Sequence, residues 1–249
     1  MLSPQKIVEA WVSEAEQVLA SAPAANEGCG PVWRDVVSMA KEYFLACMSL
    51  LDKGLLLPAC ALLRIAAELT LKFRWCIEAP GVRGDTREVR LMRWKKKSAH
   101  EWIKIVQTCE AAGFPGEDLR DLLSHKSGLE ALYQRIGDRE IPDVKTLCDQ
   151  LAEGTGTEPW GGARVYLGLF RAYNPAVHVD LVLLEFMPAD GRPGTPVSGE
   201  VSARRAYRYL LLCAHMLRAG VYLYCGRRLD SVRSEFNTIM DELGFHRCA

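Results

Sequence analysis

The fold of this 249-residue chain is decided by the stretch Ala59-Cys-Ala-Leu-Leu-Arg-Ile-Ala-Ala-Glu-Leu-Thr-Leu71. Its apolar side chains cover almost the whole circumference of a helix, with no glycine or proline between them. A helix that is apolar nearly all round lies at the centre of its fold. Pro58 precedes the stretch and Pro80-Gly81 follows it, so the sequence predicts a central helix over about 58–79.

Arg64 and Glu68 are the only charged residues of this stretch. They lie one helical turn apart, so their side chains can touch, and their apolar surroundings predict that both are at least partly buried. Two interpretations stand. Either the two residues form a structural ion pair, whose attraction is largely offset by desolvation, or their charges face a cleft and hold a ligand or a partner.

Proline and glycine divide the rest of the chain into further helical segments. Ser3-Pro4 supplies a capping residue and a first-turn proline for one helix, and Asp85 or Thr86 can cap another. Further helices are expected at about 32–53, 115–135, 142–154, 159–173 and 202–225. A last amphipathic helix is expected to end near Leu243. The 32–53 segment carries on one face Val36, Met39, Tyr43, Ala46, Leu50 and Leu51.

This pattern predicts the all-α class. We expect a single bundle-like domain of about eight helices, in which the 58–79 and 202–225 helices are central. The domain spans residues 1–249, with an N-terminal helix and linker at 1–30, a core at 31–228 and a C-terminal helix at 229–249.

The segment Ala176–Phe186 has two readings. It is apolar enough for a buried helix, but its valines and leucines also alternate as in a strand. In the second reading it belongs to one short hairpin near residues 180–197, which turns around Asp190-Gly191.

Composition excludes several classes of protein. Lysine and arginine together number 31, as do aspartate and glutamate, so the formal net charge is zero. This balance gives no bulk attraction to nucleic acid or to an anionic membrane, and RNA binding would need a local patch. The nine cysteines include no Cys-x-x-Cys pair and the five histidines are scattered, so we expect no metal site and no cofactor.

The cellular environment is indicated by two negative signals. Glu9, Glu14 and Glu16 interrupt the apolar run that a signal peptide would need within Met1–Ala20, which favours a reducing cytoplasm. The most membrane-like stretch, Tyr207–Cys225, is interrupted by Arg208, His215 and Arg218. It therefore suits an internal packing helix better than a membrane span.

The clearest candidate chemistry is Arg171-Ala-Tyr-Asn-Pro-Ala-Val-His178. An arginine offers a planar fork to a phosphate, and histidine titrates near neutral pH. Metal-independent RNA cleavage needs a base that takes the proton from the 2′-hydroxyl and a cation that stabilises the developing phosphoryl charge. The alternative is a buried or capping histidine with no catalytic role, since Asn174 can cap the element that Pro175 begins.

An arginine and a histidine at this spacing, late in an all-helical chain, resemble the signature of the HEPN superfamily of helical ribonucleases and toxins. The fuller pattern is similar to a bacterial family of all-helical proteins. The shared features are Arg64-x-x-x-Glu68 on an apolar helix and a tyrosine-rich segment, with Tyr166 and Tyr173, that runs into His178. The resemblance covers about Val32–Leu223.

The resemblance implies roles for these residues. His178 would be the general base or acid and Arg171 the ligand of the phosphate and transition state, with Arg64, Glu68, Tyr173 and Asn174 as supporting residues. Such sites are often composite across a dimer, so the resemblance also implies a homodimer.

One position departs from the nuclease pattern. Nuclease members usually have a polar residue after the arginine, whereas this chain has Ala172. Either Asn174 substitutes for it or the nuclease activity is absent. The rival hypothesis is therefore a non-catalytic helical module that binds a ligand or a partner protein.

A basic run at Arg87–Lys97 is a second candidate for RNA binding. It holds Arg87, Arg90, Arg93 and Lys97 on a rough helical stripe, with Trp94 and Trp102 nearby. Basic residues with an aromatic side chain suit a single nucleic-acid strand. The alternative is a solvated helix face with the tryptophan turned inward. The remaining histidines, His100 among them, show no ligand-like spacing.

Overall fold

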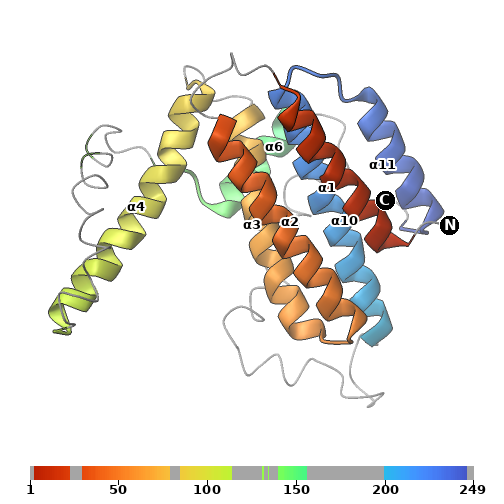
Figure 1. The fold of residues 1–249 in the computed structure, drawn as a ribbon, viewed down its shortest axis with the longest axis horizontal. Helices are drawn as coiled ribbons and strands as arrows, with labels where there is room; N and C mark the ends of the chain where they lie inside the picture. The colour runs from red at the N-terminus through yellow and green to blue at the C-terminus, as the bar shows by residue number, and fades with distance from the viewer. Residues whose placement is uncertain are drawn as a thin grey trace. The chain divides into compact units, whose positions relative to one another are not determined.

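The computed structural model describes residues 3–22, 30–78, 85–113, 131, 134, 140–155 and 199–245. Within these residues the chain forms seven helices and no strand, which confirms the predicted all-α class (Figure 1). The segments expected at 115–135, 159–173 and 176–186, and the hairpin near 180–197, lie outside the described residues apart from single helical positions at 131 and 134.

Local signals place the helix ends where the sequence predicts them. Ser3 Oγ accepts a hydrogen bond from the Lys6 amide at the start of α1 (Pro4–Ala20). Thr86 does the same for the Val89 amide at the start of α4 (Arg87–Ala111). A side-chain oxygen at this position satisfies an amide that has no partner within the helix.

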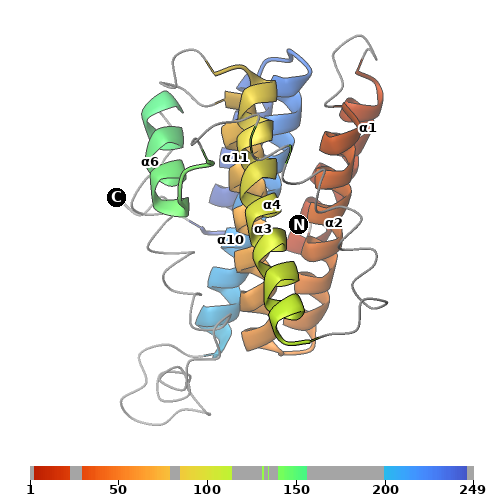
Figure 2. The same cartoon turned by 90° about the vertical axis from the view of Figure 1, so that its left-hand side faces the viewer.

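The chain divides into two compact units, one formed by residues 1–81 and 144–249 and the other by residues 82–143. The first unit is a helical bundle in which α1, α2 (Gly30–Asp52), α3 (Leu56–Glu78) and α10 (Gly199–Tyr224) run side by side (Figures 1 and 2). The sequence predicted a single domain and did not predict this division into two units. Whether the units form one domain stays a prediction.

The helices α3 and α10 are central to the first unit, as predicted. The α3 helix packs against α2, α10 and α6 (Val144–Thr155), and α10 packs against α1, α3 and α11 (Asp230–Glu242). A close contact joins the two central helices at Gly220. A Cβ atom built there would lie 2.7 Å from Phe73 Cε1 and 3.0 Å from Arg74 Cδ, so only glycine lets these helices approach to this distance.

The α2 helix presents a wider apolar surface than the bundle covers. Its core face includes Trp33 and Phe44, which are fully buried. The face named from the sequence lies at the edge of this core, because Val36 is buried whereas Met39 is 45% exposed. On α3, Ile65 is likewise 36% exposed. Part of the apolar surface of α2 and α3 is therefore not covered by the other described residues.

In the second unit, α4 is held to the segment 140–143 by its own side chains. Arg93 Nε donates to the Glu140 carbonyl oxygen over 3.1 Å. Arg93 Nη1 also lies 2.5 Å from a carboxylate oxygen of Asp85, whose side chain is buried. One arginine thus ties the helix, the residue before its cap and the chain segment that returns beside it.

Candidate functional site

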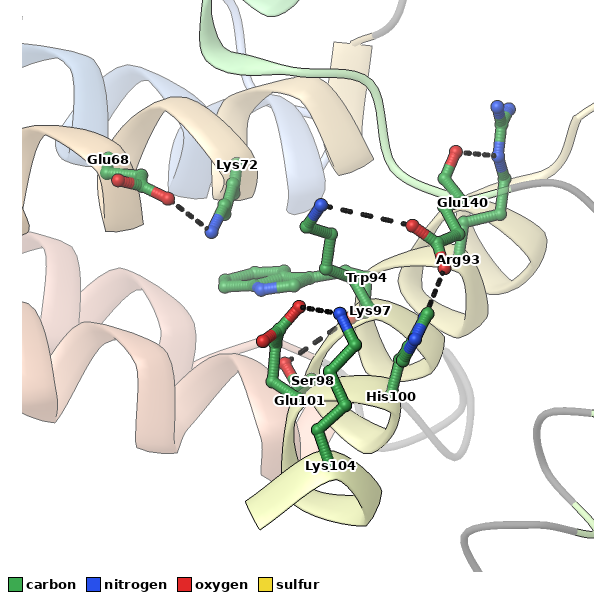
Figure 3. Close-up of polar contacts among 10 residues, drawn as sticks. All are labelled: Glu68, Lys72, Arg93, Trp94, Lys97, Ser98, His100, Glu101, Lys104 and Glu140. Atoms are coloured by element: carbon green, nitrogen blue, oxygen red, sulfur yellow. Dashed lines mark hydrogen bonds and ion pairs between the residues drawn. The ribbon is translucent and has the colours of Figure 1, made fainter. Parts of the chain in front are cut away.

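Arg64, Glu68 and Lys72 form a ladder of charges along α3. Arg64 Nη1 lies 2.8 Å from Glu68 Oε2, and Lys72 Nζ lies 2.6 Å from Glu68 Oε1. The side chains are partly buried, with 19% of Arg64 and 26% of Glu68 exposed. The predicted contact between Arg64 and Glu68 is therefore present, and a second cation that the sequence analysis did not name completes it (Figure 3 draws the Glu68–Lys72 pair).

The charge state of Glu68 follows from these contacts. Burial by itself would raise the pKa of Glu68, but the hydrogen bonds and positive charges of Lys72 and Arg64 outweigh it and hold the pKa below its ordinary value. The carboxylate is therefore ionised at neutral pH. An anion fixed between two cations can position neighbouring groups, but it is a poor acceptor of protons.

The residues of the Arg171–His178 motif lie outside the described residues. This applies to Arg171, Tyr173, Asn174 and His178 alike. Their catalytic and supporting roles stay predictions from the sequence.

The basic row on α4 is largely engaged within its own unit. Arg90 is 7% exposed, and its Nη1 donates to the Asp85 carbonyl oxygen over 2.8 Å. Arg93 is held by Asp85 and Glu140 as described above. Lys97 differs, because 48% of its side chain is exposed and its Nζ lies 3.9 Å from Glu140 Oε2. Arg87 is of intermediate burial, and a nucleic-acid contact through this row stays a prediction.

His100 takes part in a contact that the sequence analysis missed. Its Nδ1 lies 3.1 Å from Glu140 Oε1, and both side chains are about one-third exposed, at 36% and 30%. The hydrogen bond from His100 holds the pKa of Glu140 below its ordinary value, and the positive charge of Lys97 adds to this effect. The two residues are 40 positions apart, so no local spacing could have joined them. Figure 3 shows His100 and Lys97 directed at the same carboxylate.

A second polar cluster lies where α1, α10 and α11 meet. Arg218, whose side chain is 6% exposed, places Nη2 2.7 Å from Glu14 Oε2 and 2.7 Å from Glu235 Oε2. Trp11 Nε1 donates to Glu235 Oε1 over 2.9 Å, and the Tyr222 hydroxyl donates to Glu14. Each carboxylate is thus bound by Arg218 and by one aromatic donor.

His215 lies beside this cluster and is 3% exposed. Its ring stacks on Phe236 with the centroids 4.1 Å apart. Burial lowers the pKa of His215 to about 3, and the positive charges of Arg74, Arg218 and Arg233 act in the same direction. The ring is neutral near pH 7 and is sealed from solvent, which suits a packing role. The sequence signal was present, since His215 and Arg218 interrupt an apolar helix one turn apart.

Comparisons with known proteins found no match to a family model, to a curated protein or to a solved structure. Among the described residues, no group of three or more histidine, cysteine, aspartate or glutamate side chains is arranged to hold a metal ion. None of the helices in that part of the chain is long and apolar enough to cross a membrane.

Proposed function

We propose that the chain is a HEPN-like, metal-independent endoribonuclease that serves as a toxin or defence factor. The observation that supports this most is the ion pair of Arg64 and Glu68, 2.8 Å apart on the central helix α3. In this ion pair the two charged residues of the Arg-x-x-x-Glu element, on which the resemblance rests, contact each other. The all-helical bundle agrees with the helical fold that the resemblance implies.

In this proposal the reacting groups come from the Arg171–His178 motif. His178 takes the proton from a ribose 2′-hydroxyl, and that oxygen attacks the adjacent phosphorus. The bond from phosphorus to the 5′-oxygen breaks, and the departing oxygen receives a proton. Arg171 stabilises the charge on the phosphoryl oxygens. Glu68, bound by Arg64 and Lys72, is a positioning residue, and a homodimer would complete the site.

The direct experiment is cleavage of a mixed-sequence RNA by the purified chain in a metal chelator. Wild type should cut the RNA, whereas Arg171→Ala and His178→Ala should not. Arg205→Ala is a matched control, because Arg205 is an exposed arginine on α10, and it should cut like wild type. Equal cutting by all four proteins would point to a contaminant and would remove the support for this motif.

A second candidate function is a non-catalytic helical module that binds a partner protein. The open apolar surface of α2 and α3 favours it, since Met39 is 45% and Ile65 is 36% exposed. If well-folded wild-type protein cuts no RNA from a broad pool, this second function becomes the better proposal.

A further inference from the structure

Four basic side chains follow one face of α4 in the second unit. Arg93, Lys97, His100 and Lys104 are spaced by four, three and four residues, so they form a single stripe along the helix. Lys97 and Lys104 are about half exposed, at 48% and 55% of their side-chain surfaces. Figure 3 shows the stripe along α4.

The centre of this stripe is occupied by a carboxylate of the same chain. Glu140 Oε1 lies 3.1 Å from His100 Nδ1, and Glu140 Oε2 lies 3.9 Å from Lys97 Nζ. Arg93 holds the Glu140 backbone through the carbonyl oxygen, 3.1 Å from Nε. The backbone of residue 140 is therefore anchored, while its side chain, 30% exposed, lies against His100 and Lys97.

We propose that this stripe is a surface for the phosphodiester backbone of single-stranded RNA, and that the Glu140 carboxylate occupies it when RNA is absent. The inference rests on the proposed ribonuclease function, because it names the surface that receives its substrate. Charge complementarity supports this exchange, because a phosphate carries the same negative charge as Glu140 and has more acceptor oxygens.

The strength of the internal contacts permits this exchange. The Lys97–Glu140 pair is long and partly exposed, and such surface ion pairs contribute little to stability. The Lys104–Glu101 pair, at 3.6 Å, is exposed on both sides. A strand that offers several phosphates can displace both carboxylates.

The experiment measures binding without cleavage. The probe is a fluorescent, single-stranded RNA of mixed sequence with 2′-O-methyl groups, which cannot be cut through the 2′-oxygen. The double variant Lys97→Ala/Lys104→Ala should bind about tenfold more weakly than wild type near 0.1 M salt, and its salt slope should be shallower by about 1.4, the value for two lost phosphate contacts. Lys53→Ala removes an exposed lysine of the first unit and should bind like wild type.

Glu140→Gln tests the occupancy. Glutamine keeps the backbone carbonyl that Arg93 binds and still accepts a hydrogen bond from His100, so the unit should stay folded, as an unchanged melting temperature would show. The variant should bind the RNA severalfold more tightly than wild type.

Unchanged affinity in Glu140→Gln would refute the occupancy. Unchanged affinity and salt slope in the double lysine variant, or no binding by wild type, would refute the surface. Because the probe cannot be cut, these outcomes are independent of whether the chain is a nuclease.

Discussion

Arg218 on α10 binds Glu14 on α1 and Glu235 on α11 through the same nitrogen, with Nη2 2.7 Å from each carboxylate. A single guanidinium therefore links three helices of the first unit. The arginine is buried, but the two carboxylates remain 32% and 43% exposed. Water can replace the arginine as the partner of the carboxylates, which limits the contribution of these ion pairs to the stability of the fold.

Replacing this arginine should destabilise the bundle moderately. Arg218→Met keeps most of the apolar stem and removes the charge, so we expect a loss of about 1–3 kcal/mol in the free energy of unfolding, below the 3–5 kcal/mol typical when both partners are buried. Urea unfolding measures the change. Arg205→Met on the exposed side of the same helix should stay within about 0.5 kcal/mol of wild type. Equal stability of the two variants would show that the triple contact contributes nothing.

His215 predicts how stability depends on pH. The pKa of His215 is about 3 in the folded chain and near its ordinary value of 6.5 when unfolded. As pH falls below 6.5 the unfolded state binds a proton that the folded state cannot accept, so stability falls until pH reaches the folded pKa. Between pH 7 and pH 5 this group should cost about 2 kcal/mol.

The matched variant is His215→Phe, which keeps the ring that stacks on Phe236. Between pH 7 and pH 5 the free energy of unfolding of this variant should fall by about 2 kcal/mol less than that of wild type. Denaturant unfolding at several pH values gives the comparison, in which the carboxylates common to both proteins cancel. Parallel pH profiles for the two proteins would contradict the assignment of a neutral, buried His215.

The contact at Gly220 should not accept a side chain. In Gly220→Ala the new Cβ would meet Phe73 and Arg74 at 2.7 and 3.0 Å, which forces α3 and α10 apart and should cost about 1–3 kcal/mol. Gly30→Ala is the control, because its Cβ would meet only the Tyr224 hydroxyl at an ordinary 3.8 Å. Thermal unfolding distinguishes the two variants, and a Gly220→Ala protein as stable as wild type would show that the helices do not pack this closely.

The helices could be predicted because their signals are local. The cap at Ser3, the cap at Thr86 and the apolar circumference of 59–71 act within one or two turns of the chain. The face of α2 was harder to predict. Its apolar residues continue past the edge of the core, so periodicity alone did not distinguish buried Val36 from open Met39.

The polar clusters could not be predicted because they depend on contacts between distant residues. Tyr222 and Glu14 are 208 residues apart and meet only after α1 and α10 pack. The His100–Glu140 contact similarly needs residue 140 to return beside α4. The contact between Arg64 and Glu68 could be predicted, because the two residues lie four positions apart on one helix.

If Glu68 positions the reacting groups, removing its charge should slow RNA cleavage. Glu68→Gln weakens two ion pairs, with Arg64 and Lys72, and should lower kcat about tenfold, the equivalent of roughly 1.4 kcal/mol. The KM for RNA should change little, because Glu68 does not contact the strand in this proposal. An unchanged kcat, or a loss that appears only in KM, would contradict the positioning role.

The decisive measurement is the chemistry of the cleaved ends. The wild-type protein is incubated in a metal chelator with RNA and, separately, with the same sequence carrying 2′-O-methyl groups. Mass spectrometry then identifies the products. We expect 2′,3′-cyclic phosphate and 5′-hydroxyl ends from RNA, no cleavage of the methylated strand, and loss of all cleavage in His178→Ala. Cleavage that needs added metal, that leaves 5′-phosphates or that proceeds on the methylated strand would contradict a 2′-hydroxyl mechanism centred on His178.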